Sequence, residues 1–260
     1  MIEDLGAVGS AFLLTMLAGL STGIGSLLAY FIKKPKMSYL SFSLGLSAGV
    51  MVYVSFVELL PQALNTLGEL HAITAFFLGI LCIGLIDMAI PEKENPHSYS
   101  GLTNETNSST DKTLLRTGVL TALAIGIHNF PEGLATFGTA LNNLNLGIVI
   151  ALAIAIHNIP EGISVSMPIY YATKSRKKAF TYSFLSGLAE PAGAVIGFLI
   201  LLPFLSDEVL YSLLAFVGGI MVYISIDELL PIAHQYGHGH TVILGVILGM
   251  FVMALSLMFL

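Results

Sequence analysis

Apolar segments long enough to cross a lipid bilayer recur almost from one end of this chain to the other. A helix needs roughly 20 predominantly apolar residues to span the hydrocarbon core of a membrane. Only 10% of the 260 residues are charged, whereas an ordinary soluble domain carries roughly 25%. The polar surface is too small to cover a soluble globule of this length, so the sequence predicts an all-α integral membrane protein whose single transmembrane domain covers 1–260.

We expect eight transmembrane helices, and the basic residues indicate which way they cross. The expected helices are 7–32, 38–60, 72–90, 113–140, 146–171, 179–202, 208–231 and 241–260. All ten Lys and Arg residues lie in or beside the loops after the first, third and fifth helices, whereas the loops near 61–71, 141–146 and 203–207 have none. By the positive-inside rule the basic loops are cytoplasmic. Both termini are therefore expected on the outer side of the cell (inner) membrane.

Two of the expected cytoplasmic loops have unusual compositions. The longest, 91–112, is rich in Asn, Ser, Thr and Pro, which predicts a mobile polar connection. The loop 232–240 has no Lys or Arg but contains His234, His238 and His240. These histidines could collect metal ions, and a flexible polar loop without that role is an equal alternative.

The sequence repeats itself in two places. Residues 49–61 read GVMVYVSFVELLP and residues 219–231 read GIMVYISIDELLP, while HNFPEG at 128–133 is followed by HNIPEG at 157–162. The paired segments lie on helices that are expected to cross the membrane in opposite directions. Such inverted repeats imply a pseudo-two-fold axis in the membrane plane, an arrangement that many secondary transporters use. We expect helices 1–3 to repeat as helices 6–8, and helix 4 to repeat as helix 5.

The two HNxPEG segments place ionisable side chains deep within otherwise apolar helices. Residues four apart share one helix face, so His128 lies beside Glu132 and His157 beside Glu161. An ionised carboxylate at mid-membrane costs at least ~2.5 kcal/mol, and no Lys or Arg lies near these positions in any expected helix. A divalent cation would compensate the carboxylates, and mixed nitrogen and oxygen ligands suit zinc, iron, manganese or cobalt.

Further polar residues extend this pattern. Glu190, in the small-residue segment SGLAEPAG, is a third candidate carboxylate ligand. Pro131 and Pro160 lack the amide hydrogen that a regular helix uses, which predicts a hydrated kink beside the ligands. Acidic residues near the expected ends of helices 2 and 7 either line the access routes of the metal or are simply solvated: Glu58, Asp227 and Glu228.

These motifs resemble those of the ZIP (Zrt/Irt-like) metal transporter family, most closely its bacterial members. The resemblance rests on both HNxPEG segments, SGLAEPAG at 186–193, ELLP at 58–61 and DELLP at 227–231, and it covers essentially the whole chain. It implies the ZIP fold and the uptake of zinc, with iron, manganese, cobalt or cadmium as further substrates, and no catalytic cofactor. It also implies a homodimer and an elevator-like shift of helices 1, 4, 5 and 6 against the others.

The resemblance further implies a binuclear metal site in the middle of helices 4, 5 and 6. One metal ion would be bound by His128, Glu132, His157 and Glu161. The second would be bound by Asn129, Glu132, Asn158, Glu161 and Glu190, so that Glu132 and Glu161 bridge the two ions.

Two alternative functions differ in what the central carboxylates do. An intramembrane metal-dependent hydrolase would use its metal to activate water, but the His-Glu-x-x-His motif is absent from the sequence. A structural membrane protein without transport would leave the metal content of the cell unchanged when the carboxylates are removed. We predict a transporter and not an enzyme, with the metal ion and the lipid bilayer as partners. The net charge of −6 and the short basic clusters do not indicate nucleic-acid binding.

Overall fold

The structure is a computed structural model of the chain, and it describes residues 5–31, 37–89, 107–201, 204, 206–236 and 239–259. The described residues are helical almost throughout and contain no strand. Seven continuous helical segments among them are long and apolar enough to span a membrane, so the chain is a multi-pass membrane protein. His238 and most of the polar loop 91–112 lie outside the described residues.

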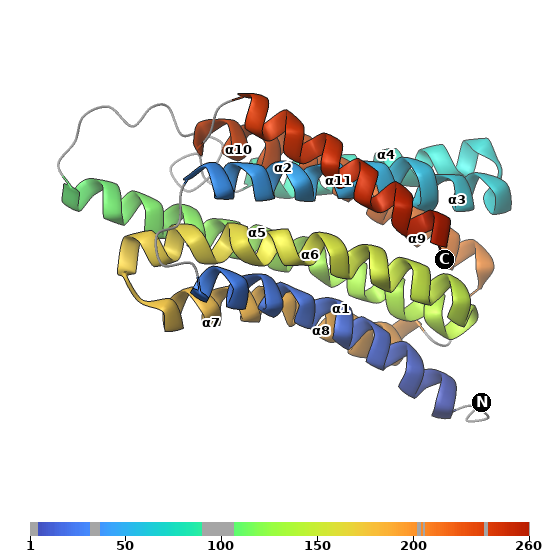
Figure 1. Cartoon of the computed structure of the whole chain (residues 1–260). Coiled ribbons are helices and arrows are strands. Elements are labelled where there is room, and N and C mark those ends of the chain that lie inside the picture. Colours follow the sequence, from blue (N-terminus) through green and yellow to red (C-terminus); the bar gives the residue numbers. More distant parts are fainter. Residues whose placement is uncertain are drawn as a thin grey trace.

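The described residues form the eight helices that the sequence predicts, and three of these consist of shorter pieces. The undivided helices are α1 (Leu5–Phe31), α4 (Glu69–Ala89), α5 (Asn107–Asn142), α6 (Leu144–Thr173) and α11 (Gly239–Phe259). The divided ones are α2 (Met37–Val54), η1 (Ser55–Leu59) and α3 (Leu60–Leu67); α7 (Arg176–Gly187), α8 (Ala189–Ile196) and η3 (Gly197–Leu201); and α9 (Asp207–Ile224), η5 (Ser225–Leu229) and α10 (Leu230–Tyr236). The start of α1 and the end of α11 lie at the same end of the bundle (Figure 1).

The helices that contain Pro61 and Pro231 do not end there, contrary to the prediction. A π-turn precedes each proline: η1 leads from α2 into α3, and η5 leads from α9 into α10. The wider π-turn shifts the hydrogen-bond pattern by one residue, so the helix continues although proline donates no backbone hydrogen bond. The loops expected near 61–71 and at 232–240 are consequently shorter, because α3 reaches Leu67 and α10 reaches Tyr236.

The two π-turns are structurally equivalent copies. The hydroxyl groups of Ser55 and Ser225 each donate a hydrogen bond of 2.7 Å to the carbonyl four residues earlier. The two copies run in opposite directions, since α3 and α10 lie at opposite ends of the bundle (Figure 1). The inverted repeat is therefore confirmed. Three acidic residues that we expected at helix ends lie within these π-turns instead: Glu58, Asp227 and Glu228.

Two other boundaries differ from the prediction. Helix α5 begins at Asn107, so the last part of the expected polar loop is helical. The expected helix 179–202 begins at Arg176 and is interrupted at Leu188, between α7 and α8. Pro191 lacks an amide hydrogen, and the carbonyl of Gly187, which it would otherwise have bound, faces Gly19 of α1 instead.

The helices pack in two groups, which appear as two layers in Figure 1. The first group contains α1, α5, α6, α7 and α8, and the second contains α2, α3, α4, α9, α10 and α11. Glycines permit very close packing within each group: a Cβ atom added to Gly25 of α1 would lie 1.8 Å from the carbonyl oxygen of Ile159 in α6. Similarly, a Cβ added to Gly49 of α2 would lie 2.2 Å from the carbonyl oxygen of Val246 in α11. Every described glycine that touches another helix does so within its own group.

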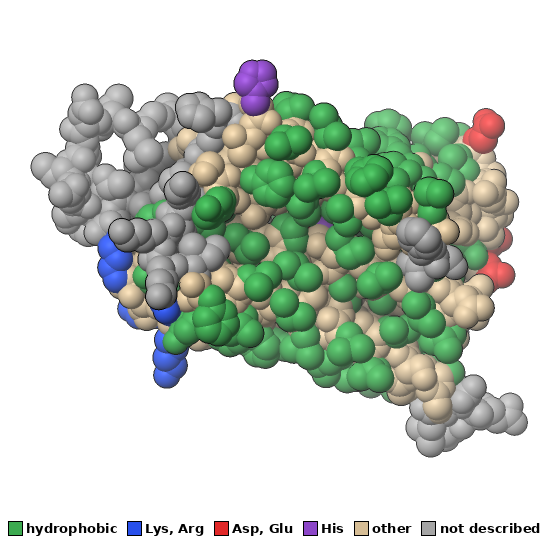
Figure 2. All heavy atoms as spheres, in the orientation of Figure 1, with side chains coloured by type: hydrophobic (Ala, Val, Ile, Leu, Met, Phe, Trp, Pro, Cys, Tyr) green, Lys and Arg blue, Asp and Glu red, His purple; other side chains and the backbone are tan. Residues whose placement is uncertain are grey.

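Larger apolar side chains separate the two groups. Ala135, Ile150 and Ile154 of the first group face Leu214 and Val217 of the second across a small apolar cavity. Hydrophobic side chains also cover the middle of the outer surface, while Lys and Arg gather at one end of the molecule and Asp and Glu at the other (Figure 2). The fold is thus a membrane bundle of two closely packed halves that meet through side chains.

Candidate metal site

The seven predicted ligands come from the first group of helices and have no exposed surface. His128, Asn129 and Glu132 lie on α5, His157, Asn158 and Glu161 on α6, and Glu190 in the first turn of α8. Burial of this many polar groups in a membrane helix bundle is costly unless they find partners. Their contacts with one another therefore decide what the site can bind.

Each histidine is paired with the glutamate of the other helix. The Nε2 atom of His128 lies 3.2 Å from Oε1 of Glu161, and Nε2 of His157 lies 3.5 Å from Oε2 of Glu132. The polar faces expected from the four-residue spacing thus meet across the contact between α5 and α6. These four side chains are the ones predicted to bind the first metal ion.

The asparagines extend the cluster toward α8 and α1. The Nδ2 group of Asn158 donates hydrogen bonds to Oε1 of Glu190 and, at 3.0 Å, to the carbonyl oxygen of Ala18 in α1. The Nδ2 group of Asn129 donates a longer bond of 3.4 Å to the carbonyl oxygen of Ser186 in α7. The amide nitrogens are thus held by neighbouring atoms. The side-chain oxygens of both asparagines have no hydrogen-bond partner among the described residues.

Several other buried oxygen and nitrogen atoms of the cluster also have no hydrogen-bond partner among the described residues. They include Oε1 of Glu132, one oxygen each of Glu161 and Glu190, and Nδ1 of both histidines, while Oε2 of Glu132 has only its 3.5 Å contact with Nε2 of His157. Leaving one buried polar group unsatisfied costs about 1–3 kcal/mol, and more if it is charged. No group of three or more His, Cys, Asp or Glu side chains within the described ranges already surrounds a common point as a metal-binding shell. Some acceptor atoms of the cluster therefore have no donor, although other atoms of the same side chains contact one another.

Glycines bring the neighbouring helices against this cluster. A Cβ added to Gly133, which follows Glu132, would lie 2.1 Å from the carbonyl oxygen of Glu190. A Cβ added to Gly162, which follows Glu161, would lie 2.0 Å from the carbonyl oxygen of Thr22 in α1. Only glycine fits at these positions, so the final Gly of each HNxPEG segment sets the distance from α8 and α1 to the ligands.

Two residues of the second group reach the site: sequence reasoning missed Ser47 and gave Glu228 only as an acid that lines an access route or is solvated. Ser47 of α2 is fully buried and lies close to Glu161. Glu228 in η5 is close enough to His128 for an electrostatic interaction. Ser47 lies in an apolar run and carries no motif, so nothing in the sequence singled it out. These two residues place the cluster at the interface between the two groups.

Comparison with known proteins agrees with this architecture. The model of the family described as ZIP Zinc transporter matches residues 89–257. The chain is 60% identical to the zinc transporter ZupT of Chlorobium phaeovibrioides over 96% of its own length and 97% of the relative. It is 55% identical to the zinc transporter ZupT of Streptococcus mutans, again over 96% and 97%. For the zinc transporter ZupT of Nitratidesulfovibrio vulgaris the identity is 52% over 99% of both chains.

These relatives are transporters and not enzymes, which confirms the choice of a transporter over an intramembrane hydrolase. The matched range includes the two HNxPEG segments and the helices that carry them. The chain therefore belongs to the ZIP family of zinc transporters.

Proposed function

We propose that the protein carries zinc across the inner membrane into the cytoplasm, with iron, manganese, cobalt and cadmium as further substrates. The relatives named as zinc transporters support zinc as the substrate. The observation that carries the proposal is the buried cluster on α5, α6 and α8. It combines three carboxylates with two imidazoles and two amides, and it leaves several acceptor atoms without donors. A divalent cation supplies the charge that these acceptors lack.

The proposed centre binds two ions. The first would be held by His128, Glu132, His157 and Glu161, after the ion replaces the two histidine–glutamate pairs. The second would be held by the oxygens of Asn129 and Asn158 together with Glu190, with Glu132 and Glu161 bridging. The unpartnered oxygens of both asparagines and of Glu190 support the second position.

The basic end of the molecule is proposed to face the cytoplasm. Helix α7 begins there with Arg176, Lys177 and Lys178, whereas α9 begins at the opposite end with Asp207 and Glu208. The positive-inside rule then directs both termini outward. Metal would pass from the acidic end to the basic end.

Movement of the first group against the second is the proposed way of exposing the site to each side in turn. The glycine contacts tie helices together within a group, whereas larger apolar side chains line the cavity between the groups. Contacts of Ser47 and Glu228 with the site would change during this shift. We further expect a homodimer, as the family resemblance implies, which mass measurement of the purified protein in a membrane mimetic tests.

Uptake by reconstituted protein tests the proposed transport. Purified protein in liposomes is expected to load zinc along a zinc gradient, and Glu161→Gln is expected to abolish loading, because it removes a bridging carboxylate. Glu208→Gln, which neutralises an exposed acid in the first turn of α9, is the matched control and should transport like the parent. Equal zinc loading by the parent and Glu161→Gln would contradict the proposed site.

A further inference from the structure

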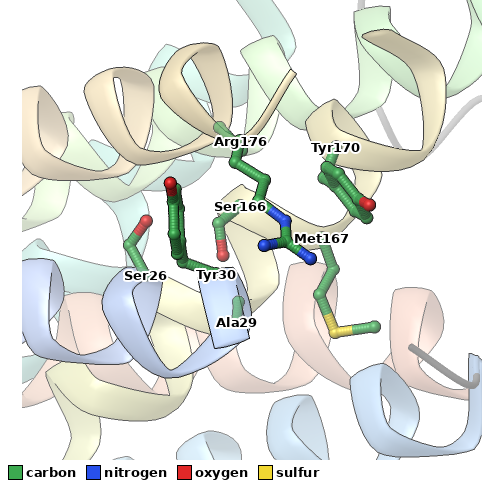
Figure 3. Close-up of a pocket in the computed structure, with 8 residues that line it drawn as sticks. Ser26, Ala29, Tyr30, Ser166, Met167, Tyr170 and Arg176 are labelled. Carbon is green, nitrogen blue, oxygen red and sulfur yellow. The ribbon is translucent and has the colours of Figure 1, made fainter. Parts of the chain in front are cut away.

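A small pocket lies between α1, α6 and α7 at the basic end of the molecule, away from the metal site (Figure 3). Arg176 enters it from the first turn of α7. The guanidinium carbon of Arg176 lies 5.0 Å from the ring centre of Tyr30 and 5.8 Å from that of Tyr170. Both distances are within the range of a cation–π contact. The two rings thus hold a planar, permanently charged group at the junction of three helices.

The start of α7 carries more positive charge than the amino end of a helix normally does. Its first three residues are Arg176, Lys177 and Lys178, and its first turn contains no acidic residue. The amino end of a helix is already positive and prefers acidic side chains or anions. The hydroxyl of Ser175 accepts a hydrogen bond only from the amide of Lys178, so the earlier amides of the turn remain donors without an intrahelical acceptor. The ion pairs of the described residues do not include Arg176.

A buried hydroxyl inside the pocket independently indicates a ligand. Ser26 is 1% exposed, lines the pocket and has no hydrogen-bond partner among the described residues. Its oxygen points away from α1 toward the space beside Tyr30 and Ser166 (Figure 3). The free volume of ≈ 10 Å³ is close to the smallest that admits a water molecule. The pocket can therefore receive one oxygen atom of a ligand whose bulk stays at the mouth, beside Arg176.

We propose that this pocket binds the phosphate headgroup of an anionic phospholipid in the leaflet at the basic end. A phosphate oxygen would accept from Ser26, and the other oxygens would accept from the Arg176 guanidinium, whose fork geometry suits phosphate. Tyrosines are characteristic of the headgroup level of a membrane, and basic pockets between helices on the cytoplasmic side suit anionic headgroups. Exposed Lys174 adds positive charge near the mouth.

The ligand would connect three helices of the first group to the membrane surface. Tyr30 belongs to the last turn of α1, Tyr170 to the last turn of α6 and Arg176 to the first turn of α7. Lipid binding at this point requires no metal ion. It therefore goes beyond zinc transport and can be measured in metal-free protein.

Lipid titration of the purified full-length protein tests the proposal. The thermal unfolding midpoint is followed in a neutral detergent while phosphatidylglycerol or phosphatidylcholine is added, without metal. Phosphatidylglycerol is expected to raise the midpoint of the parent in a saturable way, and phosphatidylcholine is not. Arg176→Gln is expected to weaken the apparent affinity at least about tenfold, as for the loss of a charge-assisted phosphate contact, and Ser26→Ala by several fold.

Lys177→Gln is the matched control, because it removes one charge from the same helix turn without altering the pocket. It is expected to change the affinity less than about threefold, as for an exposed charge. An equal loss in Lys177→Gln and Arg176→Gln would overturn the proposal in favour of a diffuse charge effect. The same saturable shift with inorganic phosphate would also overturn it, because the ligand would then be a soluble anion. If Arg176→Gln does not fold, native mass spectrometry of the parent protein replaces this comparison. Retention of no more phosphatidylglycerol than phosphatidylcholine by the parent would overturn the proposal.

Discussion

Buried acceptors without donors are the residue-scale feature that distinguishes this protein from a purely structural bundle. The carboxylates of Glu132, Glu161 and Glu190 lie in a membrane core, where they contact imidazole and amide groups. Such a cluster destabilises the metal-free protein, because desolvation of charged groups is not fully compensated by these contacts. Binding of a divalent cation should consequently stabilise the fold as well as prepare transport.

Zinc is therefore expected to raise the unfolding midpoint of the purified protein. At a free concentration 100 times the dissociation constant, binding to the native state contributes about 2.7 kcal/mol. His157→Ala should lose most of this stabilisation because it removes a ligand. His71→Ala is the control, since His71 is exposed on α4. The midpoints are measured by differential scanning fluorimetry with zinc and after chelation; zinc stabilisation of His157→Ala equal to that of the parent would exclude this histidine as a ligand.

Glycine and proline positions determine how the elements pack. The π-turns let the helices of the repeat continue past proline, and glycine sets the contacts between helices within each group. At Gly25 and Gly162 the backbones of α1 and α6 approach so closely that any side chain would collide with a carbonyl oxygen. The position of the metal site relative to α1 therefore depends on α1 and α6 remaining in contact.

Gly25→Ala is expected to destabilise the protein by about 1–3 kcal/mol, as for other overpacked interiors, and to reduce zinc uptake. The added Cβ would lie 1.8 Å from the carbonyl oxygen of Ile159, so α1 must move away from α6. Gly9→Ala in the same helix is the control, because nothing lies within 4 Å of its added Cβ. That variant should be neutral or slightly more stable, since alanine favours a helix. Thermal unfolding compares the two, and equal midpoints would contradict the close contact.

At the scale of the whole molecule, two groups of helices share one interface and one polar site. A hydrogen bond at the acidic end joins them: Nδ2 of Asn142 at the end of α5 lies 3.0 Å from Oδ1 of Asp207 at the start of α9. Ser47 and Glu228 also approach the metal site from the second group, and apolar side chains face each other across the cavity between the groups. A relative shift of the groups must break this polar contact.

Covalent linkage of the two groups at this point is expected to stop transport. Asn142→Cys and Asp207→Cys, combined in a background with Cys82→Ser, should lose zinc uptake on oxidation and regain it on reduction. A control pair, Leu78→Cys and Glu208→Cys with a short bis-maleimide, links two helices within the second group, where both residues line one groove. The control should retain uptake. Full activity of the oxidised Asn142–Asp207 pair would argue against movement between the groups.

The charge asymmetry makes a separate prediction about orientation. In the same Cys82→Ser background, a membrane-impermeant maleimide should label Glu208→Cys in intact cells, and Lys177→Cys only after lysis. Both positions are exposed at opposite ends of the bundle. The reverse labelling pattern would place the termini in the cytoplasm.

Periodicity, composition and repetition in the sequence are sufficient to determine the membrane fold. Long apolar runs with few charges allow no other class of fold, and the repeated segments required two halves of opposite direction. The paired HNxPEG segments also located the buried polar residues, because residues four apart on a helix share a face. These features are local, so the order of residues along the chain is enough to infer them.

Only the tertiary structure decided how the helices group and which atoms meet at the site. The π-turns before Pro61 and Pro231 depend on hydrogen bonds that a sequence pattern does not reveal, so the helix ends there were predicted wrongly. Ser47 reaches Glu161 from a distant helix, and the cation–π pocket around Arg176 joins three helix ends. Such contacts arise from packing between segments far apart in the chain, where shape and close approach of backbones, rather than local preference, determine which side chains become neighbours.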